Sequence, residues 1–177
     1  MSPQPILLVE DDENDVFFFQ RAMRKTGMTH PLQVARDGQE AINYLEGGGK
    51  FACRAEFPLP VLILLDLKLP LVMGLDVLRW IRQQPSLTPI VVILSSSRAE
   101  ADVAEAYRLG ANAYLVKPSQ TNELGDMVRA VSEFWLKQNT PPPSSRMERE
   151  PEMTKERATD WAGHRPVVTG SFAQVSV

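Results

Sequence analysis

The sequence of 177 residues predicts an α/β domain with a parallel sheet that is covered by helices on both faces. Five short apolar stretches alternate with five segments of helical composition, which is typical of strands joined by crossover helices. The middle stretch, residues 61–65, is apolar at every position, as expected of a strand with both faces buried. The connections between parallel strands are expected to be right-handed.

The predicted elements alternate along the chain. Strands are expected at residues 6–9, 32–35, 61–65, 90–94 and 113–116. Helices are expected at about residues 14–26, 40–45, 75–84, 99–109 and 122–138. Gly27 and Gly110 follow the first and fourth helices, where a glycine commonly ends a helix. Before the third strand we expect a polar, irregular loop that contains Cys53.

Composition limits the class of protein. Hydrophobic residues make up 44% of the chain, which is enough for a core. Lys and Arg number 19 against 22 Asp and Glu, and no block of basic residues occurs, so nucleic acid is not an expected partner. The single cysteine, Cys53, excludes an internal disulfide. We expect a cytoplasmic protein with no membrane partner, because the sequence shows neither a signal peptide nor an apolar run of roughly 20 residues.

The composition changes at Asn139. The last 39 residues, 139–177, contain five of the fourteen prolines and equal numbers of acidic and basic residues, five of each. Their few large apolar residues are scattered and offer no core. We therefore expect one folded domain over residues 5–138, followed by a proline-rich, disordered tail over residues 139–177.

Residues that carry chemistry close four of the five predicted strands. They are Glu10 and Asp11 after the first strand, Asp66 after the third, Ser95 after the fourth and Lys117 after the fifth. The carboxyl ends of parallel strands meet at one edge of a sheet, so these side chains should converge there. Three carboxylates together need a compensating cation, and Mg²⁺ combines few carboxylates with phosphate oxygens. The set predicts a site where Asp66 attacks phosphorus, Lys117 neutralises the phosphoryl oxygens and Ser95 donates a hydrogen bond.

Each of these residues also has a purely structural interpretation. Residues 10–12 can form a solvated acidic turn, and residues 95–97 can cap a helix. Asp66 can be a turn former, and Lys117 can be a surface lysine before a proline. All of these interpretations would have to hold together at four strand ends, so we favour the phosphate site.

Four segments of the chain together resemble response-regulator receiver domains. They are Val-Glu-Asp-Asp at residues 9–12, Leu-Leu-Asp-Leu-Lys-Leu-Pro at 64–70, Leu-Ser-Ser-Ser at 94–97 and Tyr-Leu-Val-Lys-Pro at 114–118. The resemblance covers residues 5–138, and it is most like the single-domain regulators that partner bacterial phytochromes and related sensor histidine kinases. It implies the flavodoxin-like (βα)5 fold, a doubly wound parallel sheet with strand order 2-1-3-4-5.

The resemblance also implies roles for individual residues. Asp66 would accept a phosphoryl group from a kinase histidine. Glu10, Asp11, Asp66 and the backbone carbonyl of Lys68 would hold Mg²⁺. The family places a cis peptide bond between Lys117 and the proline that follows it, which is a bond type that tolerates cis geometry.

Three further residues are expected to act in switching or in partner binding. By the resemblance, Ser95 would be the switch hydroxyl and Tyr114 the switch aromatic, although Tyr114 can also simply pack on the fourth helix. Residues 17–19 are all Phe, and successive helical residues point about 100° apart, so at least one ring should be exposed. By the family pattern Phe17 lies on the face of the first helix that docks against a histidine kinase.

The predicted function is that of a stand-alone response regulator, a signalling protein rather than an enzyme, which accepts phosphate on Asp66 and signals by protein contact. A homodimer is a possible form. One alternative is a scaffold that has the fold but takes no phosphate. The other is an aspartate-nucleophile phosphohydrolase, which usually carries a second Asp two residues after the nucleophile, where this chain has Lys68.

Overall fold

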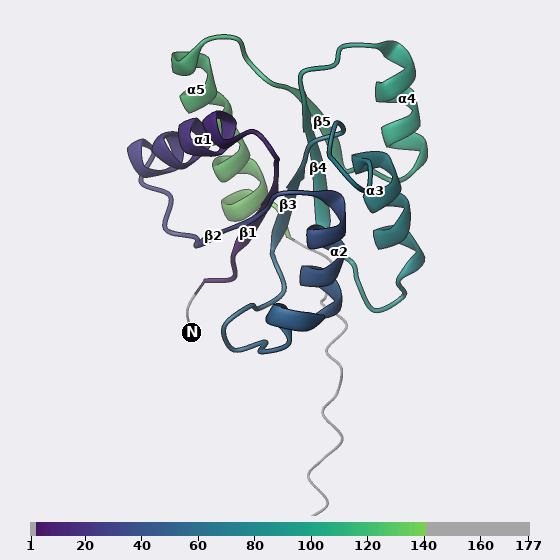
Figure 1. Cartoon of the computed structure of the whole chain (residues 1–177). Helices are drawn as coiled ribbons and strands as arrows, with labels where there is room; N and C mark the ends of the chain where they lie inside the picture. The colour runs from purple at the N-terminus through teal and green to yellow at the C-terminus, as the bar shows by residue number, and fades with distance from the viewer. Residues whose placement is uncertain (1–2, 141–177) are drawn as a thin grey trace, which may run out of the picture. The chain divides into compact units, whose positions relative to one another are not determined.

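A computed structural model describes residues 3–140 of the chain (Figure 1). Five strands form one sheet: β1 (Ile6–Val9), β2 (Leu32–Ala35), β3 (Leu62–Leu65), β4 (Ile90–Ser95) and β5 (Ala113–Val116). All pairings are parallel and the strand order is β2-β1-β3-β4-β5. The predicted fold class and strand order are confirmed. Beyond its first two residues, the predicted tail lies outside the described residues.

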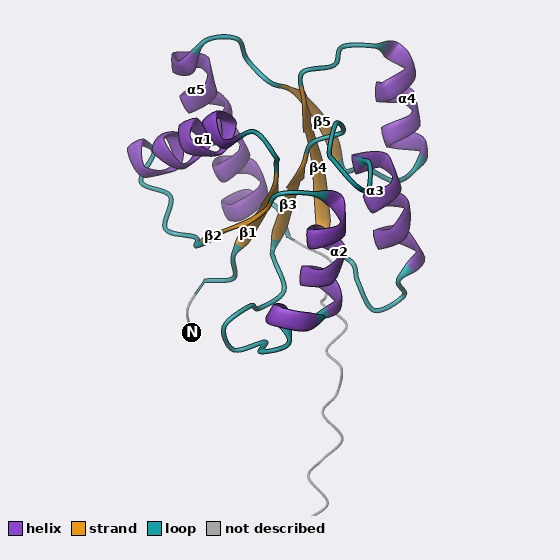
Figure 2. Ribbon diagram, in the orientation of Figure 1, coloured by secondary structure: helices purple, strands orange, loops and turns teal. Residues whose placement is uncertain are grey.

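Five α-helices connect and follow the strands (Figure 2): α1 (Glu13–Lys25), α2 (Gly38–Glu46), α3 (Gly74–Gln83), α4 (Glu100–Arg108) and α5 (Thr121–Val131). Each predicted helix is present, but the last differs in form. The hydrogen bonding of α5 widens to π-type turns over Ser132–Gln138. A short 3₁₀ turn, Gly49–Phe51, lies within the segment expected to be irregular.

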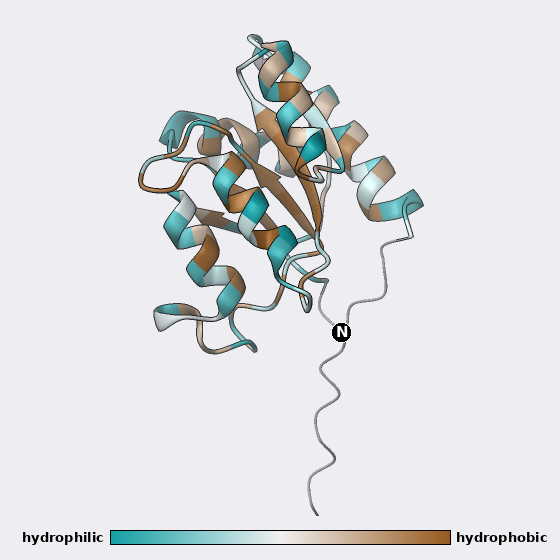
Figure 3. Ribbon diagram, turned by 90° about the vertical axis from the view of Figure 1, so that its right-hand side faces the viewer, coloured by the Kyte–Doolittle hydropathy of each residue, from teal (hydrophilic) through white to brown (hydrophobic). Residues whose placement is uncertain are grey.

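The helices cover both faces of the sheet. Figure 1 shows α1 and α5 on one face and α2, α3 and α4 on the other. Alternate residues of a strand point to opposite faces, so β1 contributes Leu7 and Val9 to one core and Ile6 and Leu8 to the other. All four residues of β1 are buried, as are all four of β3. This explains the unbroken apolar stretches in the sequence, which Figure 3 shows as brown strands between the helices.

The segment between α2 and β3 is ordered by an aromatic cluster. Phe51 packs on Tyr44 and Phe57, with ring centroids 5.1 Å from each. Arg54 donates hydrogen bonds to the backbone carbonyls of Tyr44, Leu45 and Phe57. The polar loop predicted here therefore has a fixed structure, because one guanidinium joins carbonyls in the last turn of α2 to a carbonyl of the loop itself. Within the described part of the chain, none of the helices has the length and apolar character that a membrane span requires.

Two glycines fix the loop that follows β3. A Cβ added to Gly74 would lie 2.0 Å from the backbone oxygen of Asp66, and one added to Gly38 would lie 2.0 Å from that of Val72. Between them, the Val72 N–H donates to the Pro70 carbonyl at 2.8 Å in a tight turn whose central residue, Leu71, has φ 63°. This positive φ is uncommon for a residue with a bulky side chain.

The Gly74→Ala variant should lose roughly 2 kcal/mol of folding free energy or more, because the new methyl group clashes with the Asp66 backbone. The matched control is Gly125→Ala in α5, where a Cβ meets open space, and it should gain about 0.5–1 kcal/mol. Urea denaturation measures both. Equal stabilities would show that the loop after β3 yields to a methyl group.

Candidate functional site

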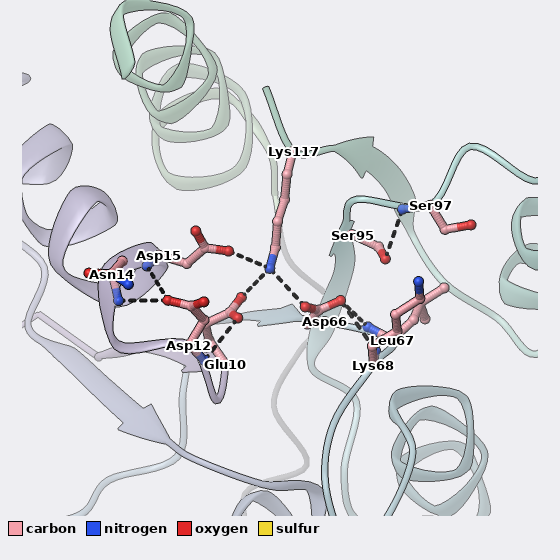
Figure 4. Close-up of polar contacts among 10 residues, drawn as sticks. All are labelled: Glu10, Asp12, Asn14, Asp15, Asp66, Leu67, Lys68, Ser95, Ser97 and Lys117. Carbon is pink, nitrogen blue, oxygen red and sulfur yellow. Dashed lines mark hydrogen bonds and ion pairs between the residues drawn. The ribbon is translucent and has the colours of Figure 1, made fainter. Parts of the chain in front are cut away.

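The carboxyl ends of the strands bring the predicted site residues together (Figure 4). Val9 of β1 pairs in register with Leu65 of β3, so the next residues on the two strands, Glu10 and Asp66, leave the sheet side by side. Ser95 closes β4, its neighbour on the other side. Glu10, Asp66 and Ser95 are buried polar residues, with 2%, 6% and 0% of their surfaces exposed. Their burial shows that they belong to a built site and not to a solvated turn.

The ammonium of Lys117 lies at the centre of this site. Its Nζ donates to Glu10 Oε2 at 2.5 Å, to Asp66 Oδ2 at 2.7 Å and to Asp15 Oδ2 at 2.9 Å. A lysine ammonium has three N–H donors, and all three are used here. The Lys117 side chain is only 16% exposed, which excludes the interpretation of a free surface lysine.

The backbone orients the carboxylate of Asp66. Its Oδ1 accepts hydrogen bonds from the N–H of Leu67 at 2.6 Å and of Lys68 at 3.3 Å. Its Oδ2 accepts the bond from Lys117. Both oxygens are therefore held by hydrogen bonds, and these fix the orientation of the carboxylate.

Glu10, Asp11 and Asp66 form a group that can hold a metal ion. Each offers one carboxylate oxygen, and these oxygens all lie within 4.8 Å of one another. Carboxylate oxygens are the ligands of hard divalent cations such as Mg²⁺ and Mn²⁺. The structure thus supports the expected metal site, while a ligand role for the Lys68 carbonyl remains a prediction.

Asp12, the third residue of the acidic run that begins at Glu10, has a different role. Asp12 caps α1, because its Oδ1 accepts from the N–H of Asn14 at 2.7 Å and of Asp15 at 3.2 Å. These bonds lower the pKa of Asp12, with the Asp15 N–H as the largest influence. Adjacent acidic residues are therefore divided between the metal group and the start of a helix.

The charges of the site do not balance. Burial is the largest influence on Glu10 and raises its pKa to about 7, against the opposing effect of Lys117. Burial by itself would lower the pKa of Lys117, but its bonds with Asp15, Asp66 and Glu10 raise it. The lysine is therefore charged at neutral pH, and its single charge does not compensate the surrounding carboxylates. A divalent cation would supply the missing charge.

Comparison with known proteins agrees with this geometry. Residues 6–129 match the response regulator receiver domain. The chain belongs to this family. It is 40% identical over 141 residues to the response regulator Rcp1 of Synechocystis sp., covering 79% of this chain and 94% of Rcp1. The protein is therefore a receiver-domain response regulator of a two-component system.

Two solved structures are similar to this receiver domain. One is the phosphorylated cyanobacterial phytochrome response regulator RcpA, with a TM-score of 0.74 and 38% identity, covering 79% of this chain and 99% of that one. The other is the Mn²⁺-bound form of Rcp1, with a TM-score of 0.72 and 39% identity, also covering 79% of this chain and 99% of that one. Regulators of this family are generally signalling proteins and not enzymes.

The predicted switch residues of the receiver domain both meet the segment after β4. Ser95 Oγ accepts a weak hydrogen bond from the Ser97 N–H at 3.4 Å. The Tyr114 hydroxyl donates to the Ser97 carbonyl at 3.0 Å. Burial is the largest influence on Tyr114 and raises its pKa. Because both side chains bond to Ser97, a movement of the loop after β4 affects both.

The run of three phenylalanines divides between core and surface. Phe19 is 2% exposed, whereas Phe17 is 53% and Phe18 is 36% exposed. The expectation that at least one ring is exposed is confirmed, and Phe17 is the most exposed of the three. A role for Phe17 in partner binding remains a prediction.

One expectation about the site is wrong. Residues 3–140 contain no cis peptide bond, so the bond between Lys117 and Pro118 is trans. The trans isomer is favoured by about 0.5–1 kcal/mol at such bonds. From this trans bond Lys117 already reaches all three carboxylates, so the contact does not depend on the cis isomer.

The sequence did not identify Asp15 as a member of the site. It was assigned only to the start of the first helix. Its contact with Lys117 joins residues 102 positions apart, and one helix-opening aspartate among several acidic neighbours carries no signal of such a partner.

Substitutions of the two exposed neighbours Asp11 and Asp12 should differ in their effect on metal affinity. We expect Asp11→Asn to weaken Mg²⁺ and Mn²⁺ binding by about tenfold or more, because affinity follows the charge of the ligands. Asp12→Asn removes the same charge but keeps the cap, since Asn and Asp cap equally well, and it should change the affinity by no more than about twofold. Isothermal titration calorimetry measures both. Equal losses would indicate diffuse attraction of the ion by the acidic run.

Proposed function

We propose that this receiver domain accepts a phosphoryl group on Asp66 from a histidine of a sensor kinase and that the reaction needs Mg²⁺. The observation that carries the proposal is the Asp66 carboxylate itself, which is buried, oriented by two backbone N–H groups and bonded to Lys117. The Mn²⁺-bound relative and the phosphorylated relative support the same assignment.

The residues at the edge of the sheet would share the chemistry. An oxygen of Asp66 attacks phosphorus, an O–P bond forms, and the P–N bond to the donor imidazole breaks, with a proton taken up by that imidazole. Lys117 neutralises the phosphoryl oxygens as negative charge gathers there. Mg²⁺, held by Glu10, Asp11, Asp66 and the carbonyl of Lys68, would supply further neutralising charge.

Phosphorylation would be read out as a change of surface. A phosphoryl group adds close to two negative charges, and the Ser95 hydroxyl would move towards it as a hydrogen-bond donor. Tyr114 would then turn into the space that Ser95 and its loop leave, which changes the surface formed by α4, β5 and α5. This surface would contact a downstream partner or a second copy of the chain.

We further propose that the regulator works as a stand-alone cytoplasmic signalling protein, with a receiver domain over residues 5–138, a proline-rich tail after it and no enzymatic activity. Lys68 stands where an aspartate-nucleophile phosphohydrolase usually carries its second Asp, which argues against that alternative. The complete site argues against a scaffold that takes no phosphate. The similarity to regulators named for phytochromes favours a phytochrome-type kinase as the partner.

The phosphoacceptor is tested by mass. Wild type incubated with acetyl phosphate and Mg²⁺ should gain one phosphoryl group, and it should bind beryllofluoride. The Asp66→Asn variant should do neither, because an amide is not a nucleophile towards phosphorus. Intact-mass spectrometry and beryllofluoride titration measure the two effects. A wild type that shows no adduct and no binding would favour the scaffold.

The partner surface is tested with two equally exposed phenylalanines. Phe17, on α1, is 53% exposed, and Phe134, in the π-type turns after α5, is 52% exposed. With a phytochrome-type kinase that phosphorylates the wild type, Phe17→Ala should lower kcat/KM for phosphotransfer by about tenfold, as expected for an aromatic anchor. Phe134→Ala should leave it unchanged, and both variants should react normally with acetyl phosphate. Equal effects of the two variants would contradict docking on α1.

A further inference from the structure

Asp15 differs from the other two acceptors of the Lys117 ammonium. Glu10 and Asp66 belong to the group that can hold a metal ion, whereas Asp15 does not. The Asp15 side chain is 45% exposed, while those of Glu10 and Asp66 are 3% and 8% exposed. In Figure 4 the ammonium lies between Asp15 on one side and Asp66 on the other.

During the proposed reaction the oxygens of Glu10 and Asp66 would bind other groups besides the Lys117 ammonium. A divalent ion held by the metal group would draw on the oxygens of both residues, and the phosphoryl group would form an acyl phosphate with one oxygen of Asp66. Both events weaken the bonds that these residues make with Lys117. Asp15 takes part in neither event, so its bond with the ammonium can persist through both.

The position of Asp15 is set by the helix and not by the site. It lies in the first turn of α1, and its backbone N–H donates to the capping carboxylate of Asp12 at 3.2 Å. Lys117 follows β5 and carries its charge on a flexible four-carbon chain. A fixed anion on α1 therefore restricts a mobile cation at the end of β5.

We propose that Asp15 is a positioning residue, which holds the Lys117 ammonium beside Asp66 while the metal ion and the phosphoryl group occupy the other carboxylates. This inference rests on the proposed function. Asp15 acts through Lys117 and has no contact with the phosphoryl group.

The test is a double-variant cycle on phosphorylation by acetyl phosphate at saturating Mg²⁺. The Asp15→Asn variant should lower the maximal rate by about tenfold, the effect of one charge-assisted hydrogen bond, with Mg²⁺ affinity unchanged. Glu13→Gln removes one charge from the same turn and serves as the control, with no change expected. Because Asp15 acts through Lys117, the double variant with Lys117→Ala should react no more slowly than Lys117→Ala alone. The conservative Asp15→Glu variant should recover part of the rate.

A second measurement reports on the ammonium directly. In ¹H–¹⁵N NMR of the Mg²⁺-bound protein, the Lys117 Nζ resonance should be visible in wild type and in Glu13→Gln, because its bond to Asp15 slows exchange with water. It should be lost in Asp15→Asn.

The outcomes are separable. A wild-type rate and a visible Lys117 resonance in Asp15→Asn would overturn the inference and leave the proposed function intact. Rate losses that multiply in the double variant would also overturn it, since Asp15 would then act apart from Lys117. If wild type gains no phosphoryl group, the proposed function fails, and the NMR comparison decides whether Asp15 holds the ammonium.

Discussion

The site depends on one ammonium group surrounded by carboxylates. Burying a carboxylate is costly unless it is paired, and Lys117 provides the pairing that allows Glu10 and Asp66 to be nearly buried at the edge of the sheet. A single positive charge does not balance Glu10, Asp15 and Asp66, which all accept hydrogen bonds from it. Burial raises the pKa of Glu10 to about 7 in spite of the opposing effect of Lys117. The remaining negative charge would attract a divalent ion. Lys117 thus keeps the site assembled, and its incomplete neutralisation leaves negative charge that suits a divalent ion.

The apolar sheet fixes the positions of the charged side chains. β1 and β3 are buried on both faces, so their ends have little freedom. The pairing of Val9 with Leu65 places Glu10 beside Asp66, and the pairing of Ser95 with Val116 brings β4 and the residue before Lys117 into register. Side chains that lie far apart in the sequence therefore meet because the burial and the register of their strands fix where each strand ends.

Exposed apolar side chains lie on α1 and on the loop after β3, the two segments that follow Glu10 and Asp66. Phe17 projects from α1, while Leu71 and Met73 project from the loop after β3, and all three are at least half exposed. That loop packs closely against its surroundings, because Gly38 and Gly74 let backbone approach where a Cβ would clash. A polar centre with exposed apolar neighbours is suited to contact with another protein.

The sequence by itself determined the α/β class, the five strands, the order of the elements and the residues that close the strands. These depend on local apolar patterns and on the rule that parallel strands end at one edge. It did not reveal that Asp15 joins Lys117, that Asp12 caps a helix beside a metal group, or that Arg54 and three aromatic rings order the loop before β3. Nor did it predict the trans bond after Lys117 or the π-type turns after α5. These features were decided by the tertiary structure, because each depends on which side chains and backbone groups meet after packing, and contacts between distant residues leave no local pattern in the chain.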